Sequence, residues 1–498
     1  MSDLVLAIDA GTTGIKVLLV DSDASVRARS YAEFSQSYPE PGWVEHDPEE
    51  IWQTAHNVLA QALEEGGASA SQVAGLGITD QRETTVLWER STGRPVAPAI
   101  VWQDRRTAPI CERLKTEGLE EEVARRTGLV LDPYFSGTKI MWLLDNVEGL
   151  RKRAEAGDIA FGTIDSWLIY KMTGGEVHAT EPSNASRTLL YSLEDRTWDE
   201  WLLERFEIPR ELLPEIKPSA GRFGETTSEL FKGGSIAISG VAGDQQAALF
   251  GQACFEPGMV KNTYGTGSFV LLNTGDEVQR STHGILTTAA WDLGDTYSYA
   301  LEGSIFATGA AIQWLRDGLE IIDDASATGP LAESVPDAGG TYFVPAFVGL
   351  GAPHWDPYAR GAYIGITRGS TKAHLARAVV ESMTYQTRDV LDAMTADSGI
   401  APAELRVDGG ASVMDVLCQL QADQLGVVVK RPKNLETTAL GSGYLAGLAE
   451  GVWSSTADIQ SAWRAEVEFE PKASRDEVDT AYEGWKRALE RSRGWVEH

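Results

Sequence analysis

Short apolar runs separated by turns rich in Gly and Thr occur in both halves of the chain. Residues 4–9 and 16–20 are strand-like runs, with Ala-Gly-Thr-Thr-Gly at residues 10–14 between them. Residues 259–272 repeat this arrangement around a Tyr-Gly-Thr-Gly turn. An apolar run on each side of a Gly-containing turn predicts a β-hairpin. The two similar hairpins either reflect duplicated halves or are a coincidence, because Gly-Thr turns between strands are common.

Other apolar runs lead through a turn into a stretch with helical spacing. Residues 235–239 predict a strand, residues 240–243 a turn, and Asp244 the N-cap of the next helix. The same order of strand, turn and helix recurs at residues 405–425. Alternating strands and helices of this kind are typical of an α/β protein.

Length and composition narrow the class of protein. The 498 residues exceed what one core normally organises, so we expect two domains of about 200 to 250 residues. A formal net charge of −30 would repel nucleic acid and anionic lipid, so neither is an expected partner. Without a run of about 18 apolar residues we expect no membrane insertion. Three scattered cysteines and a start without a signal peptide favour the cytoplasm. The acidity itself is explained most simply as an adaptation for solubility.

The Gly-rich turns are candidate phosphate sites of an unusual kind. They match neither the Walker A pattern nor the dinucleotide fingerprint. A turn of small residues can instead offer backbone N–H groups and Thr hydroxyls to a polyanion. Asp9 ends an apolar run, where a buried carboxylate needs a nearby cation, and Lys16 is a candidate phosphate contact. The alternative is that Asp9 only caps its own turn.

Asp244 and the pair Arg82-Glu83 are the candidate chemical groups. Asp244, at a helix start, could accept the proton of a hydroxyl that attacks the γ-phosphate of ATP. The alternative is a carboxylate that only caps its own helix. Arg82 donates and Glu83 accepts hydrogen bonds, which suits the hydroxyls of a polyol. A surface salt bridge is the alternative for this pair.

Four aromatic residues accompany these groups: Trp102, Tyr134, Phe135 and Phe269. They could pack against the carbon face of a small substrate. The alternative is that they belong to the hydrophobic core.

Taken together, these stretches resemble the glycerol kinases of the sugar-kinase family, within the actin-like ATPase superfamily, over almost the whole chain. The similar segments are residues 38–48, 81–85, 132–139, 183–188, 242–248 and 262–267. The resemblance implies two actin-like (ribonuclease H-like) α/β domains flanking a deep catalytic cleft. It places a polyol-binding domain at residues 1–250 and a nucleotide-binding domain at residues 251–498. The implied reaction is ATP-dependent phosphorylation of glycerol to sn-glycerol 3-phosphate.

The same resemblance assigns roles to individual residues. It implies Asp244 as the base, with ATP as cosubstrate and Mg²⁺ near Asp9 and Asp244 through water. The implied glycerol site consists of Arg82, Glu83, Trp102, Tyr134, Asp244, Gln245 and Phe269. The implied nucleotide site consists of Thr12, Thr13, Gly14, Lys16, Thr266, Gly309, Gln313, Gly410, Ala411 and Met414.

The chain departs from the family pattern at three places. The first hairpin has Gly14, Ile15 and Lys16 where Ser, Ser and Arg are typical, so phosphate binding should be weaker and less bidentate. Met414 replaces a frequent Asn beside the adenine, which leaves the nucleotide preference open. The loop at residues 231–236 is short and lacks an arginine, so we expect no inhibition by fructose 1,6-bisphosphate.

Two alternative functions remain open at this stage. A kinase of erythritol, xylulose or ribulose could use the same fold. An actin-like ATPase switch could use ATP to change shape without a metabolite acceptor, although the chain has no obvious partner-binding domain. The resemblance further implies a homodimer or a homotetramer.

Overall fold

The first half of the chain is built on a six-stranded sheet. The computed structural model describes residues 3–231 and 233–496. The spatial order of this sheet is β13-β14-β5-β1-β2-β3. β1 is antiparallel to β2 and parallel to β5, and β14 is parallel to β5. The strands are β1 (Leu4–Ala10), β2 (Gly14–Asp21), β3 (Val26–Glu33), β5 (Val73–Asp80), β13 (Ala220–Glu225) and β14 (Ala237–Gly243).

The second half repeats this topology in a seven-stranded sheet. Its order is β17-β18-β16-β15-β21-β22-β23. The run β18-β16-β15-β21-β22 has the same order and the same strand directions as β3-β2-β1-β5-β14. The predicted class of two actin-like α/β units is therefore confirmed. The strands are β15 (Met259–Tyr264), β16 (Ser268–Gly275), β17 (Leu286–Asp292), β18 (Tyr297–Ile305), β21 (Glu404–Asp408), β22 (Val429–Pro432) and β23 (Ala465–Phe469).

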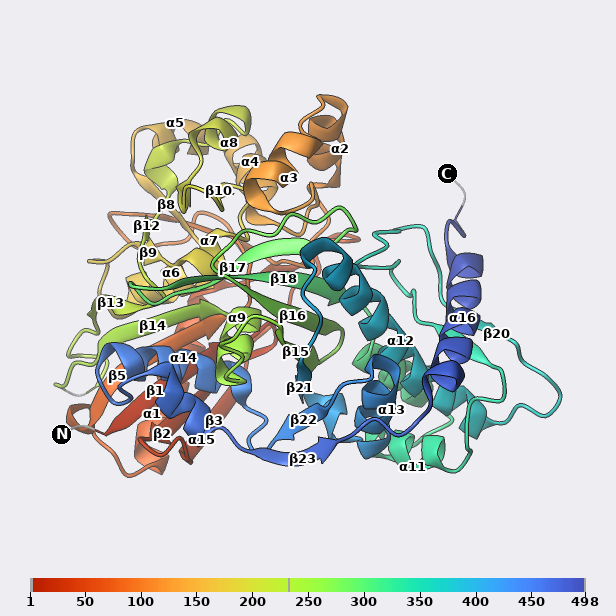
Figure 1. Ribbon diagram of the computed structural model, residues 1–498. Helices are drawn as coiled ribbons and strands as arrows, with labels where there is room; N and C mark the ends of the chain where they lie inside the picture. Colours follow the sequence, from red (N-terminus) through yellow and green to blue (C-terminus); the bar gives the residue numbers. More distant parts are fainter. Residues whose placement is uncertain (1–2, 232, 497–498) are drawn as a thin grey trace.

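Helices bury apolar side chains against both sheets (Figure 1). On the first sheet these include α1 (Pro48–Glu65) and α6 (Ile164–Met172). In the second half the helices of the corresponding core are α10 (Gly309–Asp317), α11 (Thr328–Glu333), α12 (Lys372–Ser398) and α13 (Asp415–Leu425). α16 (Arg475–Ser492) packs in a separate cluster with β19 (Tyr342–Val344). Among the helices of the described residues, we find none long and apolar enough to cross a membrane.

The two halves meet at a close helix crossing. α9 (Asp244–Gly251) follows β14, and α14 (Thr437–Ala449) follows β22. Both helices share a buried core with strands of both sheets. A Cβ atom on Gly441 would lie only 1.9 Å from the Ala247 carbonyl oxygen, so the helices touch backbone to backbone. α14 thus lies in the second half of the sequence but packs against the sheet of the first half. The division of the chain after residue 250 stays a prediction, and it falls one residue before the end of α9 at Gly251 and ahead of the start of β15 at Met259.

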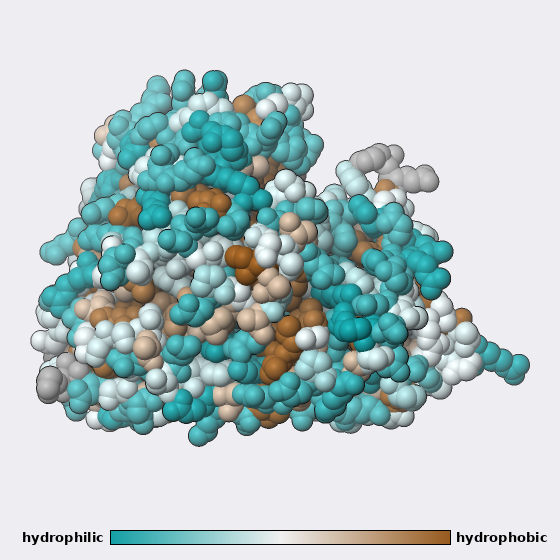
Figure 2. Space-filling model, viewed as in Figure 1, coloured by the Kyte–Doolittle hydropathy of each residue, from teal (hydrophilic) through white to brown (hydrophobic). Residues whose placement is uncertain are grey.

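A lobe made of residues 86–217 lies at the top left of Figure 1. Some of its buried side chains, including Trp88 and Trp167, belong to the core of the first sheet. Others share a core with Leu286 of β17 and Tyr299 of β18, so the lobe also rests on the second sheet. Besides α6, its elements include β6 (Val86–Glu89), β7 (Ala99–Ile100), α2 (Ala108–Thr116), α3 (Glu120–Thr127), α4 (Ser136–Asn146), α5 (Leu150–Glu155), β8 (Ile159–Gly162), β9 (Ala179–Thr180), α7 (Pro182–Ala185), β10 (Tyr191–Ser192), β11 (Thr197–Trp198), α8 (Glu200–Arg205) and β12 (Glu215–Ile216). Figure 2 shows a mostly hydrophilic face whose outline is notched at the top between this lobe and the region of α12 and α16.

Two local predictions are wrong by a few residues. The strand predicted for residues 235–239 is β14, which continues to Gly243, so residues 240–243 form no turn. Asp244 is the first residue of α9, and its N-cap is Gly243. Lys232, in the loop predicted to lack an inhibitor site, lies outside the described residues.

Candidate active site

The parallel strands of the first sheet bring the candidate chemical groups to one edge. Asp9 of β1 lies opposite Thr79 of β5, and Gly243 of β14 lies opposite Asp80. The segments that follow β5 and β14 therefore start side by side. Carboxyl ends of parallel strands are the usual place for a ligand in an open α/β sheet. The pair Arg82-Glu83 and the base candidate Asp244 meet at this edge.

Arg82 is surrounded by carboxylates. Its Nε lies 3.1 Å from Asp244 Oδ1, and its Nη1 and Nη2 lie 2.5 and 2.9 Å from the two oxygens of Glu302. Glu83 Oε1 accepts a hydrogen bond of 2.6 Å from Arg187 Nε. Each of these side chains except Asp244 is at most 2% exposed. The alternative of a surface salt bridge for Arg82 and Glu83 is therefore excluded, because both side chains belong to a buried network of charges.

Electrostatics in this network favour the charged forms of some groups and oppose those of others. Burial alone would raise the pKa of Glu302, but the guanidiniums of Arg187 and Arg82 outweigh burial and hold the pKa at about 2. Burial raises the pKa of Glu83 despite the same two arginines. Glu83 also has a φ of 62°, a strained conformation for a residue other than Gly. Such strain in a buried polar cluster is typical of a functional site.

Asp244 differs from the other carboxylates because it faces outward. Its side chain is 28% exposed. Its Oδ1 pairs with Arg82 and accepts a 2.7 Å hydrogen bond from the Gln245 backbone N–H. Its Oδ2 has no partner among the described residues. One oxygen is thus held in place and the other is available to accept a proton.

Some of the aromatic candidates lie beside the Arg82 network, and others lie in the hydrophobic core of the lobe. The rings of Trp102 and Tyr134 meet edge to face at 5.7 Å, and the Arg82 guanidinium lies 5.9 Å from the Phe269 ring centre. Trp102 Nε1 also donates a 2.9 Å hydrogen bond to Thr12 Oγ1, which joins a predicted glycerol contact to a predicted phosphate contact on the first hairpin turn. Phe135 is fully buried in the core of the lobe, so the core interpretation holds for it, and the buried Tyr134 belongs to the same core as well as contacting Trp102.

Three buried charged residues of the site were missed by the sequence analysis. Arg187 and Glu302 complete the network around Arg82 and Glu83. Lys261 Nζ donates to Gln245 Oε1 at 2.5 Å and to Thr263 Oγ1 at 3.0 Å, and burial lowers its pKa to about 8. The sequence does contain a signal for two of them, because Lys261 in β15 and Glu302 in β18 are each a single charged residue inside a largely apolar strand.

The first hairpin turn presents its predicted phosphate contacts with partial exposure. Thr13 is exposed, Thr12 is partly buried, and Gly14 is buried at the start of β2. Lys16 Nζ lies 2.6 Å from Glu436 Oε2 and 4.0 Å from Asp9 Oδ2. Lys16 is therefore shared between two carboxylates as well as being placed near the turn.

The remaining nucleotide candidates gather around the second hairpin turn. The N–H of Gly309 donates to the Gly265 carbonyl at 3.0 Å, and the N–H of Ala310 donates to the Thr266 carbonyl at 2.9 Å. Ala411 and Met414 share a buried cluster with Tyr264. Gly410 and Gln313 are exposed. These candidates therefore lie in the second half of the chain, on the turn between β15 and β16, on α10 and on the segment that follows β21.

Asp9 and Asp244 are the candidate ligands for a cation. Burial raises the pKa of Asp9 to about 6; Lys16 opposes this rise, while the nearby charges of Asp244 and Glu436 add to it. No cluster of three or more His, Cys, Asp or Glu suited to a metal occurs in the described residues. Mg²⁺ commonly needs only one or two carboxylates together with water and substrate phosphates. Lys16, 4.0 Å from Asp9 Oδ2, offsets the charge of Asp9 only in part, which fits such a cation.

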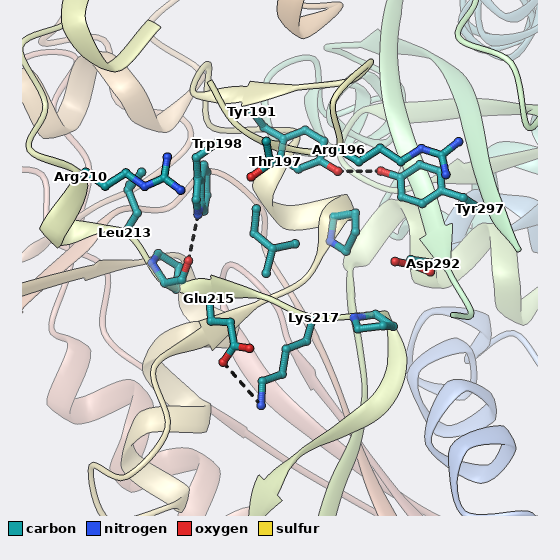
Figure 3. A pocket seen from close by; sticks show the side chains of 14 residues that line it. Tyr191, Arg196, Thr197, Trp198, Arg210, Leu213, Glu215, Lys217, Asp292 and Tyr297 are labelled. Carbon is teal, nitrogen blue, oxygen red and sulfur yellow. Dashed lines mark hydrogen bonds and ion pairs between the residues drawn. The ribbon is translucent and has the colours of Figure 1, made fainter. Parts of the chain in front are cut away.

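A cavity of about 400 Å³ lies elsewhere, in the lobe beside the second sheet (Figure 3). The hydroxyls of Tyr191 and Tyr297 bond to each other on its wall, and Lys217 lies 3.8 Å from Glu215. None of the expected site residues lines it. We therefore place the candidate active site at the Arg82 network, where the chemical groups converge.

The fold and this site define a family of phosphotransferases. The chain belongs to the FGGY family of carbohydrate kinases, whose N-terminal domain matches residues 4–251 and whose C-terminal domain matches residues 260–450. It is 56% identical to the glycerol kinase of Petrotoga mobilis over 497 residues, which is 100% of both chains. It is also 56% identical to glycerol kinase 2 of Thermotoga maritima over 491 residues, 99% of each chain. A crystal structure of Plasmodium falciparum glycerol kinase with ADP has a TM-score of 0.93 at 34% identity and covers 99% of each chain.

Proposed function

We propose that this chain is a glycerol kinase, which uses ATP to convert glycerol to sn-glycerol 3-phosphate and releases ADP. The observation that carries the proposal is the buried Arg82-Glu83 pair beside the partly exposed Asp244. A donor and an acceptor fixed next to each other suit a substrate whose hydroxyls both donate and accept. The full-length similarity to glycerol kinases supports the same acceptor.

The proposed reaction is an in-line transfer of the γ-phosphoryl group. A terminal hydroxyl of glycerol attacks the γ-phosphorus, a new O–P bond forms, and the bond to the ADP oxygen breaks. Asp244 accepts the hydroxyl proton, since its Oδ2 has no other partner among the described residues. Arg82 and Glu83 hold the other hydroxyls, and Trp102, Tyr134 and Phe269 cover the carbon chain. Gln245, held by Lys261, completes the acceptor site.

ATP is proposed to bind across the two hairpin turns. Thr12, Thr13, Gly14 and Lys16 lie on the first turn and Thr266 lies on the second. Gly309, Gln313, Gly410, Ala411 and Met414 line the nucleotide side of the second sheet. Mg²⁺, when bound near Asp9 and Asp244 through water, would neutralise charge on the transferring phosphates. A deep cleft that closes on these groups would exclude water, which competes with glycerol for the phosphoryl group.

The assembly and the location of the protein are part of the same proposal. The family resemblance supports a homodimer or a homotetramer in the cytoplasm. Light scattering at several concentrations would measure the mass of the assembly. A single mass equal to that of one chain would contradict this part without affecting the proposed reaction.

Steady-state ADP release tests the function. We would measure it with ATP and Mg²⁺ across glycerol, other polyols and pentuloses. We expect glycerol to give the highest kcat/KM, and Asp244→Asn to lower kcat by about 100-fold or more, since a positioned base contributes on that order. Glycerol binding by this variant, measured by calorimetry, should persist.

The control is Asp145→Asn, which alters a carboxylate that is 58% exposed and paired with Arg151 in the lobe. It should leave kcat unchanged. If another acceptor gives a higher kcat/KM than glycerol, the proposed substrate is wrong but the proposed mechanism still stands. If the protein hydrolyses ATP and no acceptor accelerates the reaction, the proposed kinase activity is contradicted and the ATPase switch is favoured.

A further inference from the structure

Glu302 is a fully buried carboxylate that reaches the acceptor site from the opposite sheet. It lies on β18, whereas Arg82 follows β5 of the first sheet. Both of its oxygens bind Arg82, at 2.5 and 2.9 Å, in a two-pronged arrangement. Its Oε1 also accepts a 3.0 Å hydrogen bond from Arg187 Nη2. Two cations of the first half are thus held by one anion of the second.

The same strand pair supplies the apolar wall of the site. β18 lies next to β16, and Phe269 of β16 pairs in register with Ser304 of β18. Glu302 pairs in register with Leu271, two residues from Phe269. Phe269 and Glu302 therefore project from one rigid patch of sheet. A site built on paired strands is held more firmly than one on loops.

The balance of charge shows what Glu302 contributes. Arg82 and Arg187 are cations, and Glu83 and Glu302 are the fully buried anions beside them. Without the charge of Glu302, two buried guanidiniums would share Glu83 alone. Arg82 would then turn toward Asp244, whose Oδ1 is already 3.1 Å from its Nε. A buried charge that loses its partner is costly, so this rearrangement is favoured.

We propose that Glu302 is a positioning residue that holds Arg82 in the orientation needed to bind the acceptor and keeps it from covering Asp244. The inference rests on the proposed function, since it gives Arg82 the role of an acceptor ligand. Glu302 itself is fully buried behind Arg82 and acts through it.

Glu302→Gln tests this role because it keeps the shape and removes the charge. We expect the KM for glycerol to rise about 10- to 100-fold, as for a lost bond to a charged group. The KM for ATP should stay within about twofold, because its predicted ligands lie on other elements. Glu302→Asp keeps the charge on a shorter side chain and should give an intermediate KM for glycerol. A merely structural role would lower the active fraction and leave both KM values unchanged.

Tyr299→Phe is the matched control on the same strand. It removes a buried hydroxyl that donates to the Leu193 carbonyl at 2.7 Å and accepts from Arg196 Nε at 3.1 Å, so its partners belong to the lobe and not to the network around Arg82. Its KM for glycerol should match that of the wild type. The inference is overturned if Glu302→Gln keeps a wild-type KM for glycerol, or if Tyr299→Phe raises this KM equally. If Glu302→Gln does not fold, the same comparison is made with Glu302→Asp.

A crystal structure of Glu302→Gln separates this inference from the proposed function, and Glu302→Asp again serves if the first variant does not fold. We expect the Arg82 guanidinium to have moved toward Asp244 in the variant. An unmoved Arg82 overturns the inference, whichever acceptor the wild-type enzyme prefers. Wild-type enzyme that phosphorylates no acceptor would overturn the proposed function, while a displaced Arg82 would still support the positioning by Glu302.

Discussion

His46 supports the turn between β1 and β2, the first predicted phosphate site, through two glutamines. Its Nε2 lies 2.7 Å from Gln36 Oε1, and its Nδ1 lies 3.4 Å from Gln81 Nε2. The side-chain amides of these glutamines donate to the carbonyls of Thr12 and Gly11. Burial lowers the pKa of His46 to about 4, against the raising effect of Glu50. The imidazole is therefore neutral in the folded protein at neutral pH.

This pKa predicts that the protein loses stability in mild acid. Below about pH 6.5 the unfolded chain binds a proton at His46, while the folded chain does not until about pH 4. The free energy of unfolding should therefore fall by about 2 kcal/mol from this group between about pH 7 and pH 5. Urea unfolding of wild type and His46→Asn at each pH measures it. The gap between the two proteins should narrow in acid, and a constant gap would contradict the prediction.

At the scale of elements, the crossing of α9 and α14 controls where Asp244 lies. A Cβ on Gly441 would meet the Ala247 carbonyl oxygen at 1.9 Å, and Ala247 is on the same helix as Asp244. Gly441→Ala must therefore push the two helices apart. We expect a loss of stability of about 2 to 4 kcal/mol and a lower kcat, because overpacking moves backbone. Chemical denaturation and steady-state kinetics measure the two effects.

Gly443→Ala is the matched control for this crossing. It makes the same change two residues later on α14, where the nearest atom to a new Cβ is the Ala7 side chain at 3.2 Å. It should cost less than about 1 kcal/mol, since Ala favours a helix over Gly by about that amount. Equal losses in the two variants would mean that helix contact is not the cause.

Elements whose partner is adjacent in sequence were predicted well. β1 with β2 and β15 with β16 are hairpins, so a local pattern of apolar runs and turn residues is sufficient. The predicted end of β14, at residue 239, was wrong because the contact that requires Gly240 comes from a distant part of the chain. A Cβ on Gly240 would lie 2.3 Å from the Ala446 backbone nitrogen, so this Gly serves a contact with α14 and marks no turn.

At the scale of the whole molecule, the site depends on contacts between residues far apart in sequence. Asp244, Arg82 and Glu83 could be chosen from the sequence because each stands at the end of a predicted strand or the start of a predicted helix. Their partners Arg187 and Glu302 could not, since single-chain patterns do not say which distant charges meet. Resemblance to a family supplied the roles, and the structure supplied the network that connects them.

The charge of the whole chain makes a separate prediction about salt. With a net charge of −30, folding brings many like charges together, and the compact state repels itself. Ion pairs at the surface oppose this only weakly, at about 0 to 1 kcal/mol each, and salt screens them as well. The Debye length is about 10 Å at 0.1 M salt, and charges farther apart than this are largely screened. Added salt should therefore weaken the long-range repulsion between like charges more than it weakens close ion pairs.

We therefore expect the Tm to rise by several degrees as NaCl increases from about 0.05 to about 0.5 M, a range in which the screening length shortens severalfold. Differential scanning calorimetry measures this shift. Choline chloride at equal ionic strength is the control, because it screens charge without supplying a small cation for carboxylates. Equal shifts in both salts indicate screening, and a shift confined to NaCl indicates bound Na⁺. A Tm that falls with either salt would mean that specific ion pairs outweigh the net charge.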